Sequence, residues 1–115
     1  LSLFAFVGVN SLNEVISGIK AGNATQVAKY FDNTVEISLP GNSNSYSKSQ
    51  AEVVLRDFFK NNAVKSFSVI HNGENKGSEF CIGNLITSSG TYRTTIQMKQ
   101  KGDSQVLQEL KCDLK

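Results

Sequence analysis

The sequence predicts a single α+β domain in which N-terminal helices pack on a curved antiparallel meander sheet. Apolar residues recur at helical spacing in the first half of the chain, as they do on the buried face of a helix. From Val64 onward they alternate with polar residues, and short turn sequences separate the alternating segments. Helices followed by sequentially joined strands indicate an α+β layout. We assign residues 10–115 to this one domain.

The composition agrees with a folded domain that binds neither nucleic acid nor an anionic membrane surface. Hydrophobic residues form 39% of the 115 residues and charged residues 19%, which argues against a disordered chain. The formal net charge of +2 is too small to favour an anionic polymer or lipid surface. The lysines are spread through different elements and do not cluster among aromatic residues. We therefore expect no nucleic-acid partner.

The first nine residues, L-S-L-F-A-F-V-G-V, form a nearly continuous apolar segment. They are too few to span a bilayer, which needs roughly 20 residues, and we expect no membrane span elsewhere. The segment is either a remnant of a signal peptide or the start of the first helix. We favour the signal remnant, which predicts an exported protein.

Two cysteines, Cys81 and Cys112, are too few for a disulfide scaffold, and neither belongs to a C-x-x-C motif. With only one histidine in the chain, a Cys/His zinc site would need an unusual fourth ligand, so we predict no metal site. A sequential meander puts one strand between the two cysteines, a separation of about 9.6 Å, whereas a disulfide needs α-carbons within about 7 Å. We predict two free thiols that are buried or half-buried.

Two helical segments open the domain. The spacing predicts a helix over residues 10–21 and a second, short helix over residues 24–31, with a turn at Asp32-Asn33. Asn23 belongs to an Asn-Ala-Thr sequence that has the form of a glycosylation acceptor. It also stands where a helix start needs a capping side chain, and we interpret it as a cap.

A strand hairpin and a third helix follow. Residues 34–39 alternate strictly and predict a half-buried strand, which turns at residues 40–44 into a short partner strand at Ser45-Tyr46. Ser47 and Gln50 have the spacing of a capping box. The helix that they begin runs to about residue 62, with an inward stripe of Ala51, Val54, Leu55, Phe58 and Phe59.

Four strands of period two complete the chain, at residues 64–71, 79–87, 91–99 and 106–114, with the loop after the first beginning at Asn72-Gly73. We expect their inner faces to hold Phe67, Val69, Phe80, Ile82, Tyr92 and Ile96. His71 has the parity of Phe67 and Val69, which places it at the interior or its rim. The outer face is expected to carry Arg93, Thr95, Gln97 and Lys99.

Six short segments carry a resemblance to known proteins. They are I-S-G-I-K-A-G-N-A-T-Q-V-A-K-Y-F-D at residues 16–32, Y-S-K-S-Q-A-E at 46–52, D-F-F-K-N-N at 57–62, K-S-F-S-V-I-H at 65–71, G-T-Y-R at 90–93 and L-Q-E-L at 107–110. They resemble a family of small exported bacterial proteins classified only as a domain of unknown function. The order of elements resembles the wider nuclear-transport-factor-2-like superfamily, a cone-shaped, cystatin-like fold.

The resemblance implies that the helices close the concave face of the sheet and leave a pocket. It also implies export, to the periplasm or the cell envelope. It does not indicate an activity, because the superfamily hosts isomerases, dehydratases, subunit modules and simple binders. Enzymes of the superfamily commonly use an Asp or His base that faces a Tyr or Asp donor inside the cone. The inward positions here hold no carboxylate, so we name no catalytic residue and expect no cofactor.

The expected pocket would bind a small apolar or amphipathic molecule. Aromatic and aliphatic side chains would line it, and few polar groups would orient the ligand. We expect His71 and the Tyr92 hydroxyl to orient the ligand and Phe31, Phe58, Phe67 and Val69 to contact it; Val35, Ile37, Ile82 and Ile96 complete the lining.

Our leading hypothesis is a non-catalytic, exported binding or interaction module with an apolar pocket. One alternative is a small lyase or isomerase that uses the pocket around His71. A second alternative is a structural module that forms a homodimer through the convex face of the sheet. A filled interior would favour this second alternative, because close packing leaves few voids in so short a chain.

Overall fold

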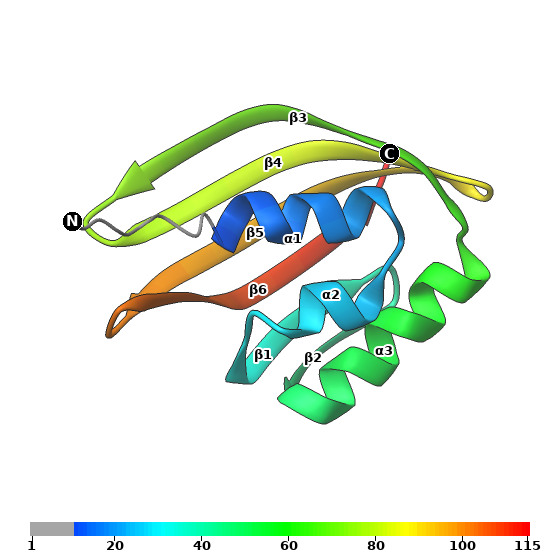
Figure 1. Ribbon diagram of the computed structural model, residues 1–115. Helices are drawn as coiled ribbons and strands as arrows, with labels where there is room; N and C mark the ends of the chain where they lie inside the picture. The colour runs from blue at the N-terminus through cyan, green and yellow to red at the C-terminus, as the bar shows by residue number, and fades with distance from the viewer. Residues whose placement is uncertain (1–10) are drawn as a thin grey trace.

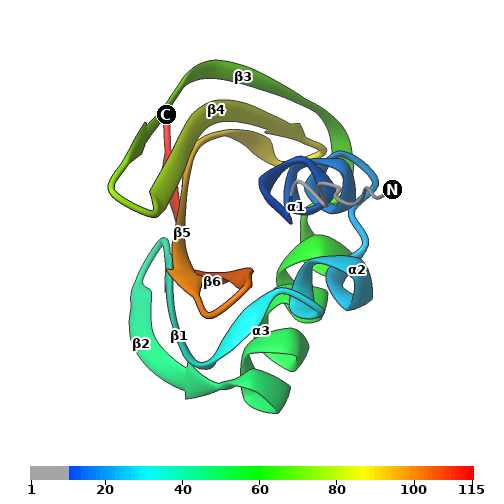
Figure 2. The same ribbon diagram turned by 60° about the vertical axis from the view of Figure 1, so that its left-hand side comes forward.

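A strongly curved sheet wraps around three helices in the structure, a computed structural model that describes residues 11–115 (Figure 1). The elements are α1 (Ser11–Lys20), α2 (Ala24–Ala28), β1 (Phe31–Leu39), β2 (Asn42–Ser47), α3 (Lys48–Asn61), β3 (Val64–Asn75), β4 (Ser78–Thr87), β5 (Gly90–Lys101) and β6 (Ser104–Leu114). Figure 2 shows all three helices on the concave side of the sheet. The predicted α+β class is confirmed, while the interpretation of residues 1–9 concerns residues outside the described part of the chain.

The three helices begin where the local sequence places them. Asn23 caps α2, because its side-chain oxygen accepts a hydrogen bond of 3.0 Å from the Gln26 amide. Ser47 and Gln50 form both hydrogen bonds of a capping box at the start of α3. Both capping interpretations are thereby confirmed. No helix within residues 11–115 is long and apolar enough to cross a membrane.

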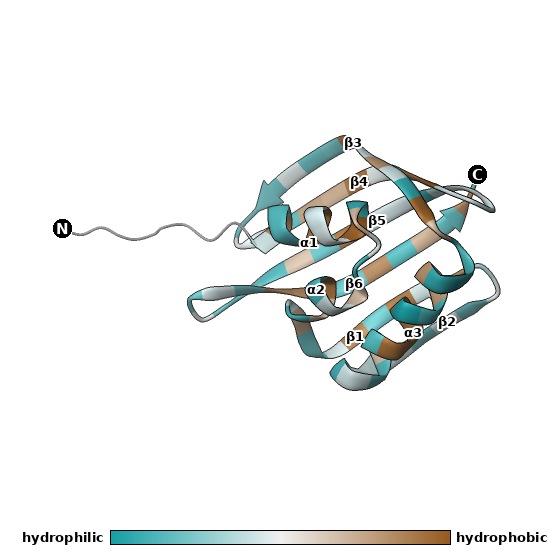
Figure 3. Ribbon diagram, turned by 45° about the vertical axis from the view of Figure 1, so that its right-hand side comes forward, coloured by the Kyte–Doolittle hydropathy of each residue, from teal (hydrophilic) through white to brown (hydrophobic). Residues whose placement is uncertain are grey.

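The helices and the concave face of the sheet form one hydrophobic core. On α3, Ala51, Leu55, Phe58 and Phe59 are buried as expected, and Val54 packs against the core partly exposed. The sheet contributes alternate residues of its strands, and Figure 3 shows the alternation as bands of apolar and polar colour along the ribbon. A helix stripe of this kind is stabilised mainly by burial against the sheet.

The last four strands form the predicted antiparallel meander, and the whole sheet has the order β2-β1-β6-β5-β4-β3. The join between β1 and β6 is parallel, with Ile37 opposite Leu110. This pairing attaches the β1–β2 hairpin to the meander across about seventy residues of sequence, a long-range contact that local periodicity does not report.

Phe31 corrects the predicted end of the second helix. The helical period continues to Phe31, but α2 ends at Ala28 and Phe31 begins β1, where it lies opposite Leu107 of β6. The register between β1 and β6 shifts between Phe31 and Glu36, which marks a bulge. Pairing with a distant strand therefore overrides the local period, and the expected turn at residues 32–33 lies inside β1.

The β3–β4 hairpin is longer than predicted. Asn72 and Gly73 lie within β3, and the turn is made by Lys76 and Gly77, both with positive φ (48° and 82°). Positive φ at both central residues is the requirement of a type I′ turn, whose backbone matches the twist of the flanking strands. The Phe80 ring packs directly against Gly73. A Cβ at this position would lie 2.6 Å from the ring, so a larger residue would collide with it.

The face of β4 that packs on the core is the opposite of the predicted one. Cys81 and Leu85 are buried on the concave side, whereas Phe80 and Ile82 are half-buried on the convex side. The apolar residues of this strand occur at both parities, so alternation alone does not identify its inner face.

Asp32 holds the start of β1 against the β5–β6 hairpin. Its carboxylate accepts hydrogen bonds from the Lys101 ammonium (2.7 Å), the Asn33 amide (2.8 Å) and the Gln108 side-chain amide (3.3 Å). The hydrogen bond from Lys101, followed by that from the Asn33 amide, lowers the pKa of Asp32 below its ordinary value of 3.8. The charged carboxylate is therefore a stabilising group of the folded state.

We expect Phe58→Ala to lower the free energy of unfolding by about 3–5 kcal/mol, because truncation loses contacts and leaves a cavity. The Phe58 ring packs edge-on against Tyr92 with centroids 5.2 Å apart. Urea unfolding followed by circular dichroism measures the change. Val53→Ala is the matched control on the same helix, since Val53 is 52% exposed. An unchanged midpoint in Phe58→Ala would contradict this packing.

Asp32→Asn should lower the stability at pH 7 by roughly 1 kcal/mol, because the amide loses the charge-assisted bond to an exposed lysine. A folded-state pKa below the unfolded value stabilises the protein above the unfolded pKa, and this stabilisation is lost as the pH falls through the folded pKa. The difference between variant and wild type should therefore shrink below about pH 4. Denaturant titrations across this range measure it, with Asp103→Asn in the exposed β5–β6 turn as control. A difference independent of pH would count against the charged role.

Candidate functional site

Most of the side chains expected to line a ligand pocket lie in the core, whereas Ile82 lies on the convex face. Phe31, Phe58, Phe67 and Tyr92 are all buried, as are Val35, Ile37 and Ile96. Their inward orientation is confirmed, but the described contacts are with other core side chains. Phe67 covers Gly83, where a Cβ would lie 2.6 Å from the ring. A ligand role for these residues stays a prediction that their packing does not support.

The Tyr92 hydroxyl holds two structural elements together. It donates a hydrogen bond of 3.0 Å to the side-chain oxygen of Asn62, which follows the last turn of α3. The Asn62 amide nitrogen donates to the Phe58 carbonyl (2.9 Å), and Ser89 donates to the same Asn62 oxygen. This network joins the end of α3 to the β4–β5 turn, so the hydroxyl expected to orient a ligand already has a protein partner.

His71 lies on the convex face, which corrects its predicted place at the interior or rim. The register of β3 against β4 shifts between Val69 and His71, so Val69 lies opposite Gly83 while His71 lies opposite Ile82. The extra residue, Ile70, is a bulge that reverses the face of every residue after it. Val69 keeps the concave side but is 40% exposed at the edge of the sheet.

Apolar side chains follow β4 on the convex face on both sides of Asn84, which accepts a hydrogen bond of 3.1 Å from Lys115. Phe80 and Ile82 are half-buried, Ile86 is 41% exposed, and the His71 ring lies 5.4 Å from that of Phe80. We call these four residues the outer stripe. Alternation in the sequence does not reveal this stripe, because it predicts Phe80 and Ile82 on the inner face. The available signal was that β4 is apolar at both parities, which is typical of a strand with two contacting faces.

Polar residues surround the outer stripe on the convex face. Thr95 lies opposite Ile82, and Gln97 lies opposite Phe80, as the outward assignment of these β5 residues predicts. Further across the sheet are charged groups of both signs, with Arg93 opposite Asp113 and Glu109 beside Glu36. Lys111 lies 3.8 Å from Asp113. The face thus combines an apolar centre with charges of both signs.

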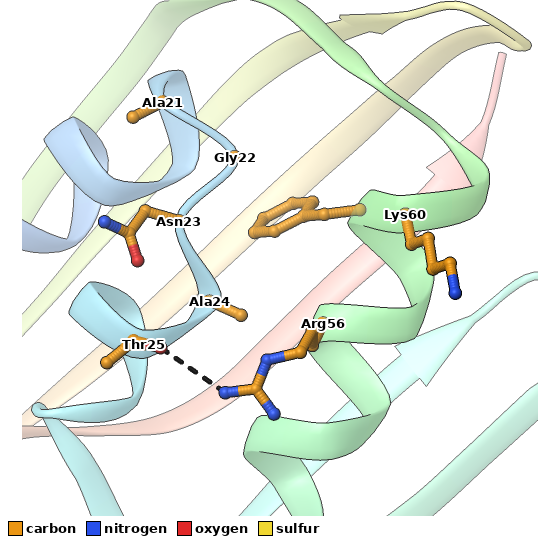
Figure 4. Close-up of a pocket in the computed structure, with 8 residues that line it drawn as sticks. Ala21, Gly22, Asn23, Ala24, Thr25, Arg56 and Lys60 are labelled. Atoms are coloured by element: carbon orange, nitrogen blue, oxygen red, sulfur yellow. Dashed lines mark hydrogen bonds between the residues drawn. The ribbon is translucent and has the colours of Figure 1, made fainter.

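A first hollow, of about 550 Å³, lies between the start of α2 and the last turns of α3. Its polar side chains include Thr25, Arg56 and Lys60. Figure 4 shows Arg56 reaching toward Thr25, to which it donates a hydrogen bond of 3.3 Å, while Lys60 extends away from α2. Glu52 accepts hydrogen bonds from both Thr25 and Arg56. The Arg56 guanidinium is therefore already paired with a carboxylate of the same chain.

A second hollow, of about 650 Å³, lies between β2 and the first turns of α3. It is lined by Asn44, Ser45, Tyr46, Ser49, Gln50, Val53 and Val54. None of these lining side chains is charged, and Val53 is half exposed. Asn42 and Asn44 both donate to the Tyr46 hydroxyl, at 3.3 and 3.4 Å, which fixes the ring at one side of the hollow. We call this hollow the β2–α3 groove.

The two cysteines are free and buried, as predicted. Burial raises the pKa of the Cys112 thiol to about 11, and it also raises the pKa of Cys81. Thr94 donates to the Cys112 sulfur at 3.7 Å within the core. Thiols in such surroundings stay protonated and are poor nucleophiles. Within residues 11–115, no group of three His, Cys, Asp or Glu side chains is placed to hold a metal ion.

Comparison with known proteins matches residues 12–113 to a family described as "Domain of unknown function (DUF4783)". A solved structure of a DUF4783 family protein from Bacteroides uniformis is 30% identical, with 90% of this chain and 95% of that chain covered and a TM-score of 0.87. No curated protein matches this sequence.

Two distant structures share the fold. An NTF2-like protein of unknown function from Cytophaga hutchinsonii is 10% identical, with a TM-score of 0.67 over 92% of this chain and 88% of that chain. A putative calcium/calmodulin-dependent protein kinase type II association domain from Thiobacillus denitrificans is 8% identical, with a TM-score of 0.69 over 91% and 92%. At these identities the likeness concerns the fold, and it confirms the NTF2-like architecture.

We expect Tyr92→Phe to lower the free energy of unfolding by about 1 kcal/mol, because it leaves the partly buried Asn62 oxygen with one donor fewer. In an Asn62→Ala background the same change should cost clearly less, since the partner is gone. Chemical unfolding of the four proteins of this cycle measures the coupling. Tyr46→Phe, on the exposed β2 hairpin, is the control. Additive effects of the two core substitutions would mean that the hydrogen bond contributes nothing.

Proposed function

This chain belongs to the DUF4783 family, and because that family has no assigned activity, we propose from the chain's own geometry that it is a non-catalytic interaction module. In this proposal, two copies pair through the convex faces of their sheets. The observation that carries it is the outer stripe, a mainly apolar row that Asn84 interrupts and that no described helix covers (Figure 2). Exposed apolar rows rimmed by polar groups are typical of protein contact surfaces.

The centre of the convex face has the composition of a contact surface. Ile82 and Phe80 lie beside the neutral side chains of Thr95 and Gln97, all four of them partly exposed. Interface centres are depleted in charge and enriched in aromatic residues. The His71 ring extends this apolar area at the edge strand by its contact with Phe80.

The charges on this face favour a second copy as the partner. A two-fold interface brings the same patch of both copies together, so one copy must supply the complement of the other. The convex face carries cations at Arg93 and Lys111, which both lie beside Asp113, and anions at Glu36 and Glu109. A rotation that sets the cations of one copy against the anions of the other relieves the adjacency of Glu36 and Glu109.

The comparisons are consistent with this use of the fold. The Thiobacillus denitrificans protein of similar architecture is described as a putative association domain. That description belongs to that protein, and at 8% identity it supports only the suitability of the scaffold for assembly.

The lyase or isomerase alternative loses the geometry that it required. It placed His71 in an enclosed pocket, whereas the ring lies on the convex face against Phe80. A carboxyl group can act as a general acid at neutral pH only when its pKa is raised. The pKa of Asp32 is lowered, which is the opposite of that requirement.

The wild-type protein should sediment as a dimer at about 100 µM, well above a micromolar dissociation constant. Ile82→Lys should shift it to monomer without changing its circular dichroism, because two charges would face each other across the centre of the interface. Analytical ultracentrifugation measures both. Val53→Lys, at an exposed position of α3, is the matched control and should remain dimeric.

Two results would overturn the proposal. One is a wild-type protein that sediments as a monomer at about 100 µM. The other is an Ile82→Lys variant that stays dimeric, which would place the contact elsewhere on the molecule.

A further inference from the structure

We propose that the β2–α3 groove binds an extended, uncharged peptide segment, which adds as a strand to the free edge of β2. The proposal concerns a different surface from the convex face and does not depend on dimerisation. Figure 2 shows β2 at one end of the sheet, running directly into α3.

The backbone of β2 offers unpaired hydrogen-bonding groups to this groove. In an antiparallel pair, residues bonded to the partner strand alternate with residues whose amide and carbonyl groups face outward. Ser47 is an outward residue, since its amide donates to the Gln50 side chain at 3.4 Å although it lies opposite Thr34. By the same alternation, the amide and carbonyl groups of Ser45 and Ser43 also face outward. Adding a peptide strand pairs such groups directly.

The β2 edge is regular enough to pair with a further strand. Its six pairs with β1 run from Thr34–Ser47 to Leu39–Asn42 with no shift of register. Proteins commonly protect a free edge with lysine, proline or a bulge, and β2 (N-S-N-S-Y-S) contains none of these. The other edge strand, β3, is interrupted by register shifts near Val64 and Val69. The β2 edge is therefore better suited than the β3 edge to pair with an added strand.

The side chains of the groove select the occupant. Val53, Val54 and Tyr46 provide apolar contact for a side chain of the added strand, and Val53 is half exposed without a described neighbour covering it. The remaining lining groups are amides and hydroxyls. A chain with 22 charged side chains, 12 basic and 10 acidic, places none in this lining. Because burying an unpaired charge is costly, the groove favours an uncharged segment.

The test uses the peptide acetyl-Thr-Val-Thr-Val-Thr-amide and the full chain labelled with nitrogen-15. We expect saturable shifts of the Ser43 and Ser45 amide signals, with a dissociation constant below about 1 mM. The same peptide N-methylated at its central residue lacks one strand donor and should bind at least about ten-fold more weakly.

Two variants test the two halves of the site. Ser45→Pro removes an outward amide and leaves the β1–β2 ladder intact, because edge strands accept proline where the amide faces solvent. Val53→Asp places a charge in the groove from α3, without changing β2. Each should weaken binding at least about ten-fold while the circular dichroism stays unchanged. Ile70→Asp, on the exposed β3 bulge, is the matched control and should bind as the wild type does.

The proposal is overturned if no saturable shift appears in β2 with the peptide at about 5 mM. It is equally overturned if Ser45→Pro and Val53→Asp both bind as tightly as the wild type. Maltotriose and acetate serve as further probes, and a shift of the groove amides with either but not with the peptide would assign the groove to a sugar or an anion.

Discussion

The bend of the six-stranded sheet is the constraint on which the rest of this structure depends. Three strand pairs shift register, in β1–β6, β3–β4 and β5–β6, and each bulge adds local twist. Gly83 allows the ring of Phe67 to lie directly on the sheet, where any Cβ would collide with it. A flat sheet could not enclose three helices on one side. The bend therefore separates a buried concave face from an open convex one.

Two polar clusters hold the surrounding elements to this curved sheet. Asp32 joins the start of β1 to the β5–β6 hairpin, and Asn62 joins the end of α3 to the β4–β5 turn through Tyr92. Both clusters lie where an element begins or ends, so they set the position of elements whose packing is otherwise non-directional. Hydrogen bonds are suited to this, because they form only within a narrow range of distances and angles.

The same bend decides which surfaces are available for function. It fills the concave side with core residues, including the aromatic rings that the sequence assigns to a pocket. It leaves the outer stripe exposed on the convex side and the β2 edge open beside α3. The two proposals use these two surfaces, one through side-chain contacts between copies and the other through backbone hydrogen bonds. Both are modes of association and need no reactive group.

The sequence by itself determined what depends on neighbours within one or two turns of chain. The capping groups of Asn23 and Ser47, the apolar stripe of α3 and the alternation of β5 all follow from contacts between residues close in sequence. The resemblance in residues 16–32 and the shorter segments added the NTF2-like architecture, which the comparisons confirm. Local chemistry and family likeness were thus enough for the fold class and most element boundaries.

Only the tertiary structure decided which way the ambiguous strands face and what their side chains touch. Ile70 adds one residue to β3, and this single insertion moves His71 from the expected interior to the convex face. Strand β4 is apolar on both sides, so its inner face depended on its register with β3 and β5. The parallel pairing that draws Phe31 out of α2, and the Asn62 partner of Tyr92, join residues far apart in the chain. Such contacts become favourable only when the distant strands have paired. For that reason no local sequence pattern predicts them.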